Sequence, residues 1–262
     1  MLHDPTLALL HTLRLRGMAE AYQTQQTLRE RDAMGFEERL VYLLEAEQQD
    51  RATRRLVRLV RQARFRFPSA AIEHVIFTHR PGLDRSVLLR LARGEWIPPG
   101  DVTLITGPTG TGKSWLACAL GHAACRRGHT VRYTRVSELC DELALLRTAG
   151  THGRLLTQLQ KTDLLILDDW AAGSFTERGR HDLLDILEDR YDRRATLVTS
   201  QFPVREWHGL IGNPTVADAL LDRLVHHAHR IELTGESLRK RKGELPEDPT
   251  AAPTSVPAGA AA

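Results

Sequence analysis

The run Gly107-Pro108-Thr109-Gly110-Thr111-Gly112-Lys113-Ser114 constrains the fold of this chain more than any other feature. It has the pattern of a phosphate-binding loop, follows a β-rich apolar run at 102–106 and opens a helix-compatible stretch that begins with Trp115. The glycines let successive backbone N–H groups point inward at a helix N-terminus, which makes a nest for anionic oxygens. Lys113 is then placed to reach the β- and γ-phosphates, and the Ser114 hydroxyl to bind Mg²⁺. The loop, with Trp115, therefore predicts a nucleoside triphosphate site; a Gly-rich turn that matches by chance is the alternative.

Composition and charge limit the class of protein. Of the 262 residues, 42% are hydrophobic and 26% are charged, as in soluble globular proteins. No apolar run approaches the ~20 residues of a membrane span, and the N-terminus lacks the layout of a secretory signal. The three cysteines, Cys118, Cys125 and Cys140, have no metal-ligand spacing. We therefore expect a cytoplasmic protein without membrane contact.

The first part of the chain is expected to be helical. Residues 1–67 have helical spacing of apolar side chains and few β-branched residues, which predicts a small all-helical domain for contact with DNA or a partner. Residues 68–100 contain Pro and Gly breaks around one short amphipathic helix at 83–93. This second segment is interpreted as a connector.

The remainder alternates strands with helices before it ends in a tail. Within residues 101–242 the expected strands are 102–106, 130–135, 164–168, 195–200 and 229–233. This alternation predicts an α/β fold with a mostly parallel five-stranded sheet flanked by helices. Residues 243–262, rich in Pro, Ala and Thr, are expected to be disordered.

A second strong signal is the acidic pair Asp168-Asp169, which follows four apolar residues at 164–167. In open α/β sheets, ligands bind at the carboxyl ends of the strands, where this pair is expected to lie. Asp168 is predicted to hold the Mg²⁺ hydration shell, and Asp169 to orient or deprotonate the attacking water. Helix capping by the two carboxylates is the alternative interpretation.

Two basic segments are candidates for contact with double-stranded DNA. Residues 51–66 hold seven arginines and no acid, and one helix face carries Arg51, Arg54, Arg58 and Arg61. A solvated face, or pairing with the upstream acids Glu45, Glu47 and Asp50, explains this stripe equally well. The second segment, 137–161, carries Arg147, Arg154 and Lys161, and its alternative is an ordinary helix pair that covers the sheet. No base-reading element is evident, so contacts are expected mainly with the DNA backbone.

Together these elements resemble the AAA+ ATPases, and within them the IstB/DnaC-like group of insertion-sequence transposition helpers. The resemblance covers most of the chain, including 13–21 near the N-terminus, and is densest at 198–201, 213–219, 221–224 and 230–239. It implies an AAA+ P-loop core at 101–242 with ATP and Mg²⁺ as cofactors. It also implies a homo-oligomer with nucleotide at the subunit interfaces and a cognate transposase as partner.

The resemblance also implies roles for four polar residues. Ser200 and Gln201 match the polar sensor at the end of the fourth core strand, although the usual Asn is absent. Arg223 matches an arginine finger supplied to the neighbouring subunit, and Arg239 a second sensor arginine acting within its own subunit. A planar guanidinium suits both roles because it neutralises charge on a transferring phosphoryl group. The alternatives are ion pairs of Arg223 with Asp218 or Asp222, and a plain basic run at 239–242.

One departure concerns the second acid of the pair. Many AAA+ ATPases carry Asp-Glu where this chain has Asp168-Asp169, so the reach to water is one methylene shorter and slow ATP hydrolysis is expected. The resulting hypothesis is an ATP-dependent DNA-binding assembly factor that oligomerises on DNA and stimulates a transposase. The alternatives are a DnaC-like helicase loader, a small-molecule or nucleotide kinase, and a nucleotide-gated scaffold that barely hydrolyses ATP.

Overall fold

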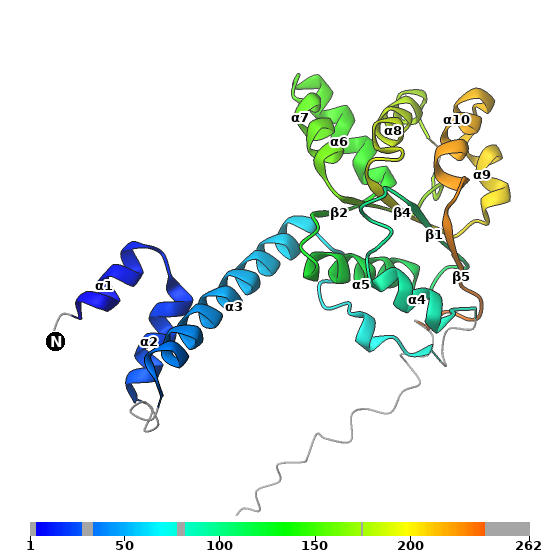
Figure 1. Cartoon of the computed structure of the whole chain (residues 1–262). Helices are drawn as coiled ribbons and strands as arrows, with labels where there is room; N and C mark the ends of the chain where they lie inside the picture. Colours follow the sequence, from blue (N-terminus) through cyan, green and yellow to red (C-terminus); the bar gives the residue numbers. More distant parts are fainter. Residues whose placement is uncertain (1–3, 28–33, 78–81, 174, 239–262) are drawn as a thin grey trace, which may run out of the picture.

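A computed structural model describes residues 4–27, 34–77, 82–173 and 175–238. Among these residues, five strands form one parallel sheet in the order β2-β3-β4-β1-β5 (Figure 1). The strands are β1 (Val102–Thr106), β2 (Val131–Arg135), β3 (Leu164–Asp168), β4 (Ala195–Ser200) and β5 (His229–Glu232). The predicted α/β fold with a parallel sheet is therefore confirmed, and β2 and β5 are each one residue shorter than predicted.

Helices bury both faces of the sheet. Below it in Figure 1 lie α4 (Arg85–Ala92) and α5 (Lys113–Arg126), and above it lie the helices α6 to α10. These five are α6 (Val136–Thr148), α7 (His152–Lys161), α8 (Glu177–Arg190), α9 (Val204–Ile211) and α10 (Pro214–Val225). Adjacent strand residues point into opposite layers, so Ile105 joins the core around α5 whereas Leu104 joins the core around α6 to α10. Every residue of β3 and β4 is buried, which explains the continuous apolar run of β3 before Asp168.

The strand order brings the two predicted chemical motifs together. β4 pairs with β1 on one side and with β3 on the other, and Thr106 at the end of β1 lies opposite Ser200 at the end of β4. Because the strands are parallel, the loop that follows β1 and the acids that follow β3 emerge at the same edge of the sheet.

The N-terminal region consists of three helices among the described residues: α1 (Pro5–Thr12), α2 (Arg16–Thr27) and α3 (Phe36–Ala63). The 28-residue α3 runs from α2 to the sheet domain, where it packs on β2 and α5 (Figure 1). Gly17 allows α2 and α3 to approach closely, because a Cβ there would lie 2.5 Å from the carbonyl oxygen of Ala46. In the described part of the chain, no helix combines the length and apolarity needed to cross a bilayer.

The segment predicted as a connector packs into the core of the sheet domain. It contains a short 3-10 helix, η2 (Ile72–His74), and then α4. Its buried side chains join the cluster around α5 and include Ile72, Leu88, Leu91, Trp96 and Ile97. At about 25 cal/mol per Å² of buried apolar area, these side chains contribute substantially to the stability of the domain.

Candidate nucleotide site and basic surfaces

The phosphate loop joins β1 to α5 through three glycines with positive φ. The φ angles of Gly107, Gly110 and Gly112 are 145°, 89° and 90°, values that side-chain-bearing residues adopt only at a cost. A Cβ on Gly107 would also lie 2.2 Å from the carbonyl oxygen of Leu233. The loop therefore needs glycine for both conformation and space, and it delivers the chain to the N-terminus of α5, where backbone N–H groups and the helix dipole favour an anion.

Lys113 is the first residue of α5 and its side chain folds back over the loop. Its Nζ donates to the carbonyl oxygens of Gly107 at 2.7 Å and Pro108 at 2.8 Å. Thr111 braces the same turn, because its hydroxyl donates to the Pro108 carbonyl at 2.9 Å. Ser114 and Trp115 follow in the first turn of α5 and are half-buried. The predicted loop residues, 107–115, thus form the turn between β1 and α5 and the first residues of α5.

Asp168 ends β3 and is fully buried. Its carboxylate accepts hydrogen bonds from the hydroxyl groups of Tyr133 on β2 and Thr199 on β4. Burial, followed by the charge of Asp168, raises the pKa of Tyr133, so this hydroxyl remains a donor. The two neighbouring strands therefore fix the orientation of a carboxylate whose predicted role is to bind Mg²⁺.

Asp169 has a different environment from its neighbour. Its φ is 58°, in the left-handed region, and its side chain is 44% exposed. Burial and the adjacent charge of Asp168 raise the pKa of Asp169, whereas the positive charges of Arg135, Arg66 and Lys113 oppose this shift. The Asp169 Oδ2 lies 3.6 Å from Arg135 Nε and 3.9 Å from Arg66 Nη1. A carboxyl group with a perturbed pKa beside a second carboxylate is characteristic of functional sites.

The two sensor candidates have different contacts. The Ser200 hydroxyl donates to the Trp170 carbonyl at 2.9 Å and accepts from the Phe202 N–H at 3.1 Å, so it is bound to backbone groups. Gln201 is exposed, and its Oε1 accepts a hydrogen bond of 2.9 Å from the hydroxyl of Thr109 in the phosphate loop. The geometry therefore favours Gln201 over Ser200 for contact with a bound nucleotide.

The late segments that carry the family resemblance also meet the loop. The N–H of Leu238 donates to the Gly110 carbonyl at 2.9 Å, and a Cβ on Gly110 would lie 2.1 Å from the Ser237 Oγ. Arg239, the predicted second sensor, lies outside the described residues. Arg223 on α10 forms ion pairs with Glu188 of α8 and, at 3.5 Å, with Asp222, so one of its predicted alternatives, the pair with Asp222, is present.

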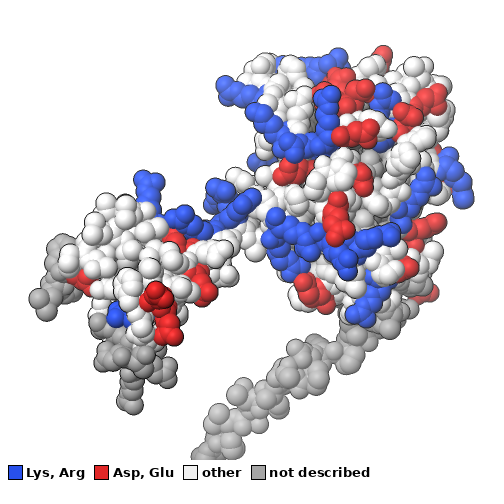
Figure 2. All heavy atoms as spheres, in the orientation of Figure 1, with Lys and Arg blue, Asp and Glu red and all other residues white. Residues whose placement is uncertain are grey.

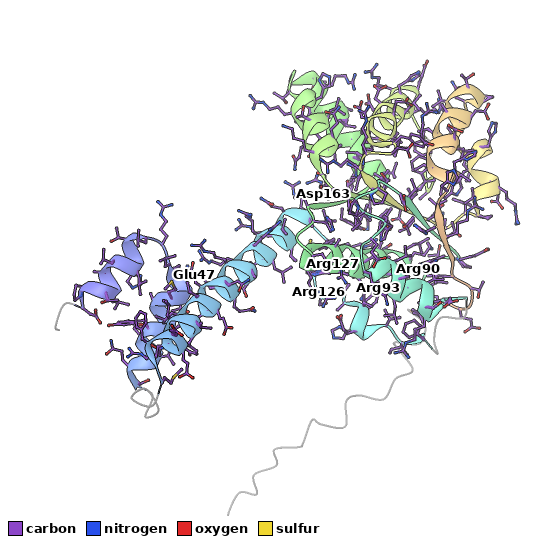
Figure 3. The ribbon with its side chains drawn as sticks, viewed as in Figure 1. Glu47, Arg90, Arg93, Arg126, Arg127 and Asp163 are labelled. Carbon is purple, nitrogen blue, oxygen red and sulfur yellow. The ribbon has the colours of Figure 1, made fainter. Side chains whose placement is uncertain are left out.

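The arginine stripe on α3 is partly neutralised. Arg51 binds Glu47 at 2.7 Å and Arg54 binds Asp50 at 2.6 Å. The interpretation that the arginines pair with upstream acids therefore holds for these two of the four arginines. Glu47, labelled in Figure 3, also accepts from the Met18 N–H at 3.2 Å and ties α2 to α3. Within the described residues, Arg58 and Arg61 form no ion pair and are exposed.

The second predicted basic segment covers the sheet as a helix pair, α6 and α7. Arg147 binds the buried carboxylate of Asp182 at 2.6 Å. Arg154 and Lys161 are exposed and form no ion pair among the described residues. In this segment, therefore, Arg154 and Lys161 are the candidates that no described acid neutralises.

Sequence reasoning missed several charged or polar groups near these sites. Tyr133, Thr199, Arg66 and Arg135 approach the acidic pair. The strand register places the first two and Arg135 there, and the packing of the chain after α3 places Arg66. A further basic patch gathers over α4 and α5 (Figure 2), where Arg90, Arg93, Arg126 and Arg127 lie near one another (Figure 3). Arg126 is paired with Glu73 at 2.8 Å. The sequence signal for this patch is weak, because its residues come from two distant segments.

Solved structures share this fold at low sequence identity. DnaI superposes with a TM-score of 0.55 at 23% identity, over 63% of this chain and 92% of DnaI. DnaA bound to AMPPCP and single-stranded DNA gives a TM-score of 0.53 at 18% identity, over 67% of this chain and 55% of DnaA. The DnaC helicase loader gives a TM-score of 0.51 at 17% sequence identity, over 56% of this chain and 86% of DnaC. These similarities show that the sheet and its helices form an AAA+ P-loop fold.

Sequence comparisons extend over nearly the whole chain. A putative insertion sequence ATP-binding protein of Sinorhizobium fredii is 50% identical over 242 residues, which cover 92% of this chain and 98% of the relative. A putative ATP-binding protein of an insertion sequence in Pseudomonas fluorescens is 44% identical over 203 residues, which cover 78% of this chain and 88% of the relative. The family model for the IstB-like ATP binding protein matches residues 8–245. Because this match takes in the N-terminal helices as well as the nucleotide site, the chain belongs to the family of IstB-like ATP-binding proteins.

Proposed function

We propose that this protein is an ATP-dependent DNA-binding assembly factor that oligomerises on DNA and stimulates the transposase of an insertion sequence. The observation that carries the proposal is the shared sheet edge, where a complete phosphate loop lies beside the fixed carboxylate of Asp168 and the exposed carboxylate of Asp169. Relatives up to 50% identical are named insertion sequence ATP-binding proteins, which supports transposition as the setting.

ATP and Mg²⁺ fit the groups at this edge. The glycine cradle and Lys113 suit the phosphates, and the Ser114 hydroxyl and Asp168 carboxylate would hold Mg²⁺. The described residues contain no cluster of three or more His, Cys, Asp or Glu for a metal, which agrees with an ion held largely by nucleotide phosphates and water. When bound, the ion neutralises charge on the phosphates. Asp169 then orients and deprotonates the attacking water, and Gln201 contacts the nucleotide from the end of β4.

Assembly is proposed to complete the site. A finger role for Arg223 requires the guanidinium to exchange Glu188 for a phosphate of the neighbouring subunit. This exchange is feasible because the Arg223 side chain is 25% exposed and that of Glu188 is 56% exposed, and exposed ion pairs contribute only about 0–1 kcal/mol. Nucleotide between subunits would then couple ATP binding to oligomerisation by mass action.

DNA is proposed to bind through backbone phosphates. Arg58, Arg61, Arg154 and Lys161 are exposed cations without ion pairs among the described residues, whereas Arg51, Arg54 and Arg147 would first exchange an acidic partner. The patch that includes Arg90, Arg93 and Arg127 adds a further basic surface (Figure 2). Binding through such contacts should weaken steeply as salt rises, because cations are released from DNA.

A helicase loader is the second candidate, because DnaC and DnaI share the fold. That similarity concerns the sheet domain at low identity, whereas the match to the insertion-sequence family begins at residue 8. Stable association with a hexameric helicase, and none with the transposase of the same element, would favour the loader. Phosphate release in the absence of any acceptor would exclude the kinase alternative.

The proposal is tested by measuring duplex DNA binding and particle size with ATP, with ADP and without nucleotide. ATP should increase both affinity and size, since only the triphosphate reaches Arg223 of the next subunit. Lys113→Ala should abolish both responses, and Arg223→Ala should retain nucleotide binding but lose ATP-dependent assembly. Arg205→Ala is a matched control, because the Arg205 side chain is 84% exposed on α9. Identical affinity and size in all three nucleotide conditions would overturn the proposal.

A further inference from the structure

A pocket lies where the end of α3 meets β2, the outermost strand on one side of the sheet. β2 pairs only with β3 in the described sheet, so its other side faces away from any strand. The pocket has a volume of about 320 Å³, and its lining includes Arg64, Arg66, Arg132, Arg135, Glu138 and Glu142. These residues come from the chain after α3, from β2 and from α6, and they include four arginines against two glutamates.

Arg132 is the buried cation of this pocket. Its side chain is 7% exposed, and one guanidinium nitrogen, Nη2, lies 3.0 Å from Glu142 Oε2. Its Nε is buried and has no hydrogen-bond partner among the described residues. Burial, followed by the nearby positive charge of Arg64, lowers the pKa of Arg132. A buried donor without an acceptor destabilises the fold, so an incoming oxyanion would supply the missing acceptor.

Arg64 also lines the pocket, and its backbone conformation is uncommon. It caps α3 with φ 56° and ψ 44°, in the left-handed region, which is unusual for a residue other than Gly, Asn or Asp. Arg64 is exposed and forms no ion pair in the described part of the chain. The end of α3 therefore places an unneutralised guanidinium beside the buried one, at an energetic cost that an anion would offset.

Arg66 and Arg135 connect the pocket to the catalytic edge. Both line the pocket, and both also approach the Asp169 carboxylate, at 3.9 Å and 3.6 Å. On the other side, the unpaired Arg58 and Arg61 of α3 precede Arg64 by six and three residues, within roughly 10 Å along the helix axis. Lys and Arg side chains gather where α3 meets the sheet domain (Figure 2).

We infer that this pocket binds a phosphate group of the DNA backbone. The inference rests on the proposed DNA-binding function and names one site of contact. A DNA strand that follows the exposed face of α3 would reach the pocket with its next phosphates. Arginine suits this ligand because its planar fork donates two parallel hydrogen bonds to phosphate oxygens. Free phosphate offers the same chemistry and is the other source that the test must separate.

The test compares full-length wild type with Arg132→Gln and Arg64→Gln in the presence of ATP. A labelled duplex is titrated over a series of salt concentrations by fluorescence anisotropy. Each substitution should weaken binding roughly tenfold at low salt, as expected for the loss of one charged hydrogen bond, and should lower the salt slope by about 1. Arg205→Gln on α9 is the matched control and should change neither quantity.

Folding is checked by thermal unfolding and by nucleotide binding. Arg64→Gln keeps the inference falsifiable if Arg132→Gln fails to fold, because Arg64 is exposed. Wild-type affinity and slope in a folded Arg64→Gln variant would overturn the assignment.

A second measurement separates the two sources of phosphate. The unfolding midpoints of the wild type and both pocket variants are recorded with and without inorganic phosphate. Phosphate bound at the phosphate loop would shift all three midpoints equally, so a difference between the proteins reports on the pocket. If phosphate stabilises the wild type more than both pocket variants while their DNA affinity is unchanged, the pocket takes a free anion and the DNA assignment fails. If the wild type itself does not bind duplex with ATP, the proposed function fails as well, which distinguishes the two failures.

Discussion

The two ends of the parallel sheet treat buried charge in opposite ways. At the amino ends of β3 and β4, Arg190 is 1% exposed, and its Nε donates to the Thr196 hydroxyl at 3.2 Å. Its two terminal nitrogens donate to the carbonyl oxygens of Leu159, Thr162, Asp163 and Ala195. All five N–H donors of the guanidinium are therefore used. At the carboxyl ends, by contrast, two carboxylates are adjacent in sequence and the second has a left-handed backbone conformation.

The charge of Arg190 therefore has a structural role, whereas the charge of Asp169 has a predicted catalytic role. Arg190 connects the end of α7 to the starts of β3 and β4, so its hydrogen bonds hold the layers together. Asp169 carries a pKa raised by burial and by Asp168, which means that its ionised form is destabilised in the fold. Strain of this kind persists only where the surrounding structure enforces it, and it concentrates at functional sites. The amino ends thus stabilise the fold, and the carboxyl ends carry the carboxylate that we propose to act on the attacking water.

The largest expected effect comes from Asp169→Asn. ATP turnover should fall about 10²–10⁴-fold, because general-base catalysis contributes factors of that size. Stability should not fall, since Asn tolerates the left-handed conformation and removes the like charge beside Asp168. A phosphate-release assay and denaturant unfolding provide the two measurements. Asp185→Asn, at an exposed position of α8, is the control, and unchanged turnover in Asp169→Asn would show that Asp169 is not catalytic.

The same substitution makes a prediction about pH. The folded-state pKa of Asp169 lies above its ordinary value of 3.8, so its contribution to stability is present below pH 3.8 and is lost as pH rises through the folded-state pKa. Asn does not ionise. The stability of Asp169→Asn relative to wild type should therefore increase as pH rises above 3.8, in unfolding experiments without metal or nucleotide. A difference independent of pH would contradict the strain assigned to this carboxylate.

The next largest effect is expected at the amino ends of the strands. Arg190→Met should lower the free energy of unfolding by about 3–5 kcal/mol, because it leaves several buried carbonyl oxygens without a donor and each such loss costs about 1–3 kcal/mol. The control is Arg194→Met, because Arg194 is 43% exposed and binds Asp163 at 2.7 Å; exposed pairs contribute at most about 1 kcal/mol. Urea denaturation measures both. Equal losses in the two variants would show that the buried hydrogen bonds of Arg190 are not the stabilising feature.

The comparison also explains how much the sequence could predict. The phosphate loop and the apolar run before Asp168 were recognisable because local residue order determines their geometry, and both lie at the predicted sheet edge. The contacts of Asp168 with Tyr133 and Thr199 depend on strand register, which no local pattern specifies. Burial also explains why Ser200, polar and well placed along the chain, bonds instead to the Trp170 carbonyl. The arginine pocket was unpredictable for the same reason, because Arg64 and Arg132 meet only in the folded chain.

The smallest expected effects on the free energy of unfolding come from substitutions of two glycines, one in a crowded position and one in an open position. Gly110→Ala places a Cβ 2.1 Å from the Ser237 Oγ at a φ of 89°, and it should cost roughly 1–3 kcal/mol, as forced left-handed residues do. Gly153 is the second residue of α7 and has nothing within 4 Å of its Cβ position, so Gly153→Ala should stabilise the protein by about 0.4–1 kcal/mol. Urea denaturation with ATP present and absent measures both. If Gly110→Ala were as well tolerated as Gly153→Ala, the segment 233–238 would not pack on the phosphate loop, and the carboxyl end would be less constrained than its geometry indicates.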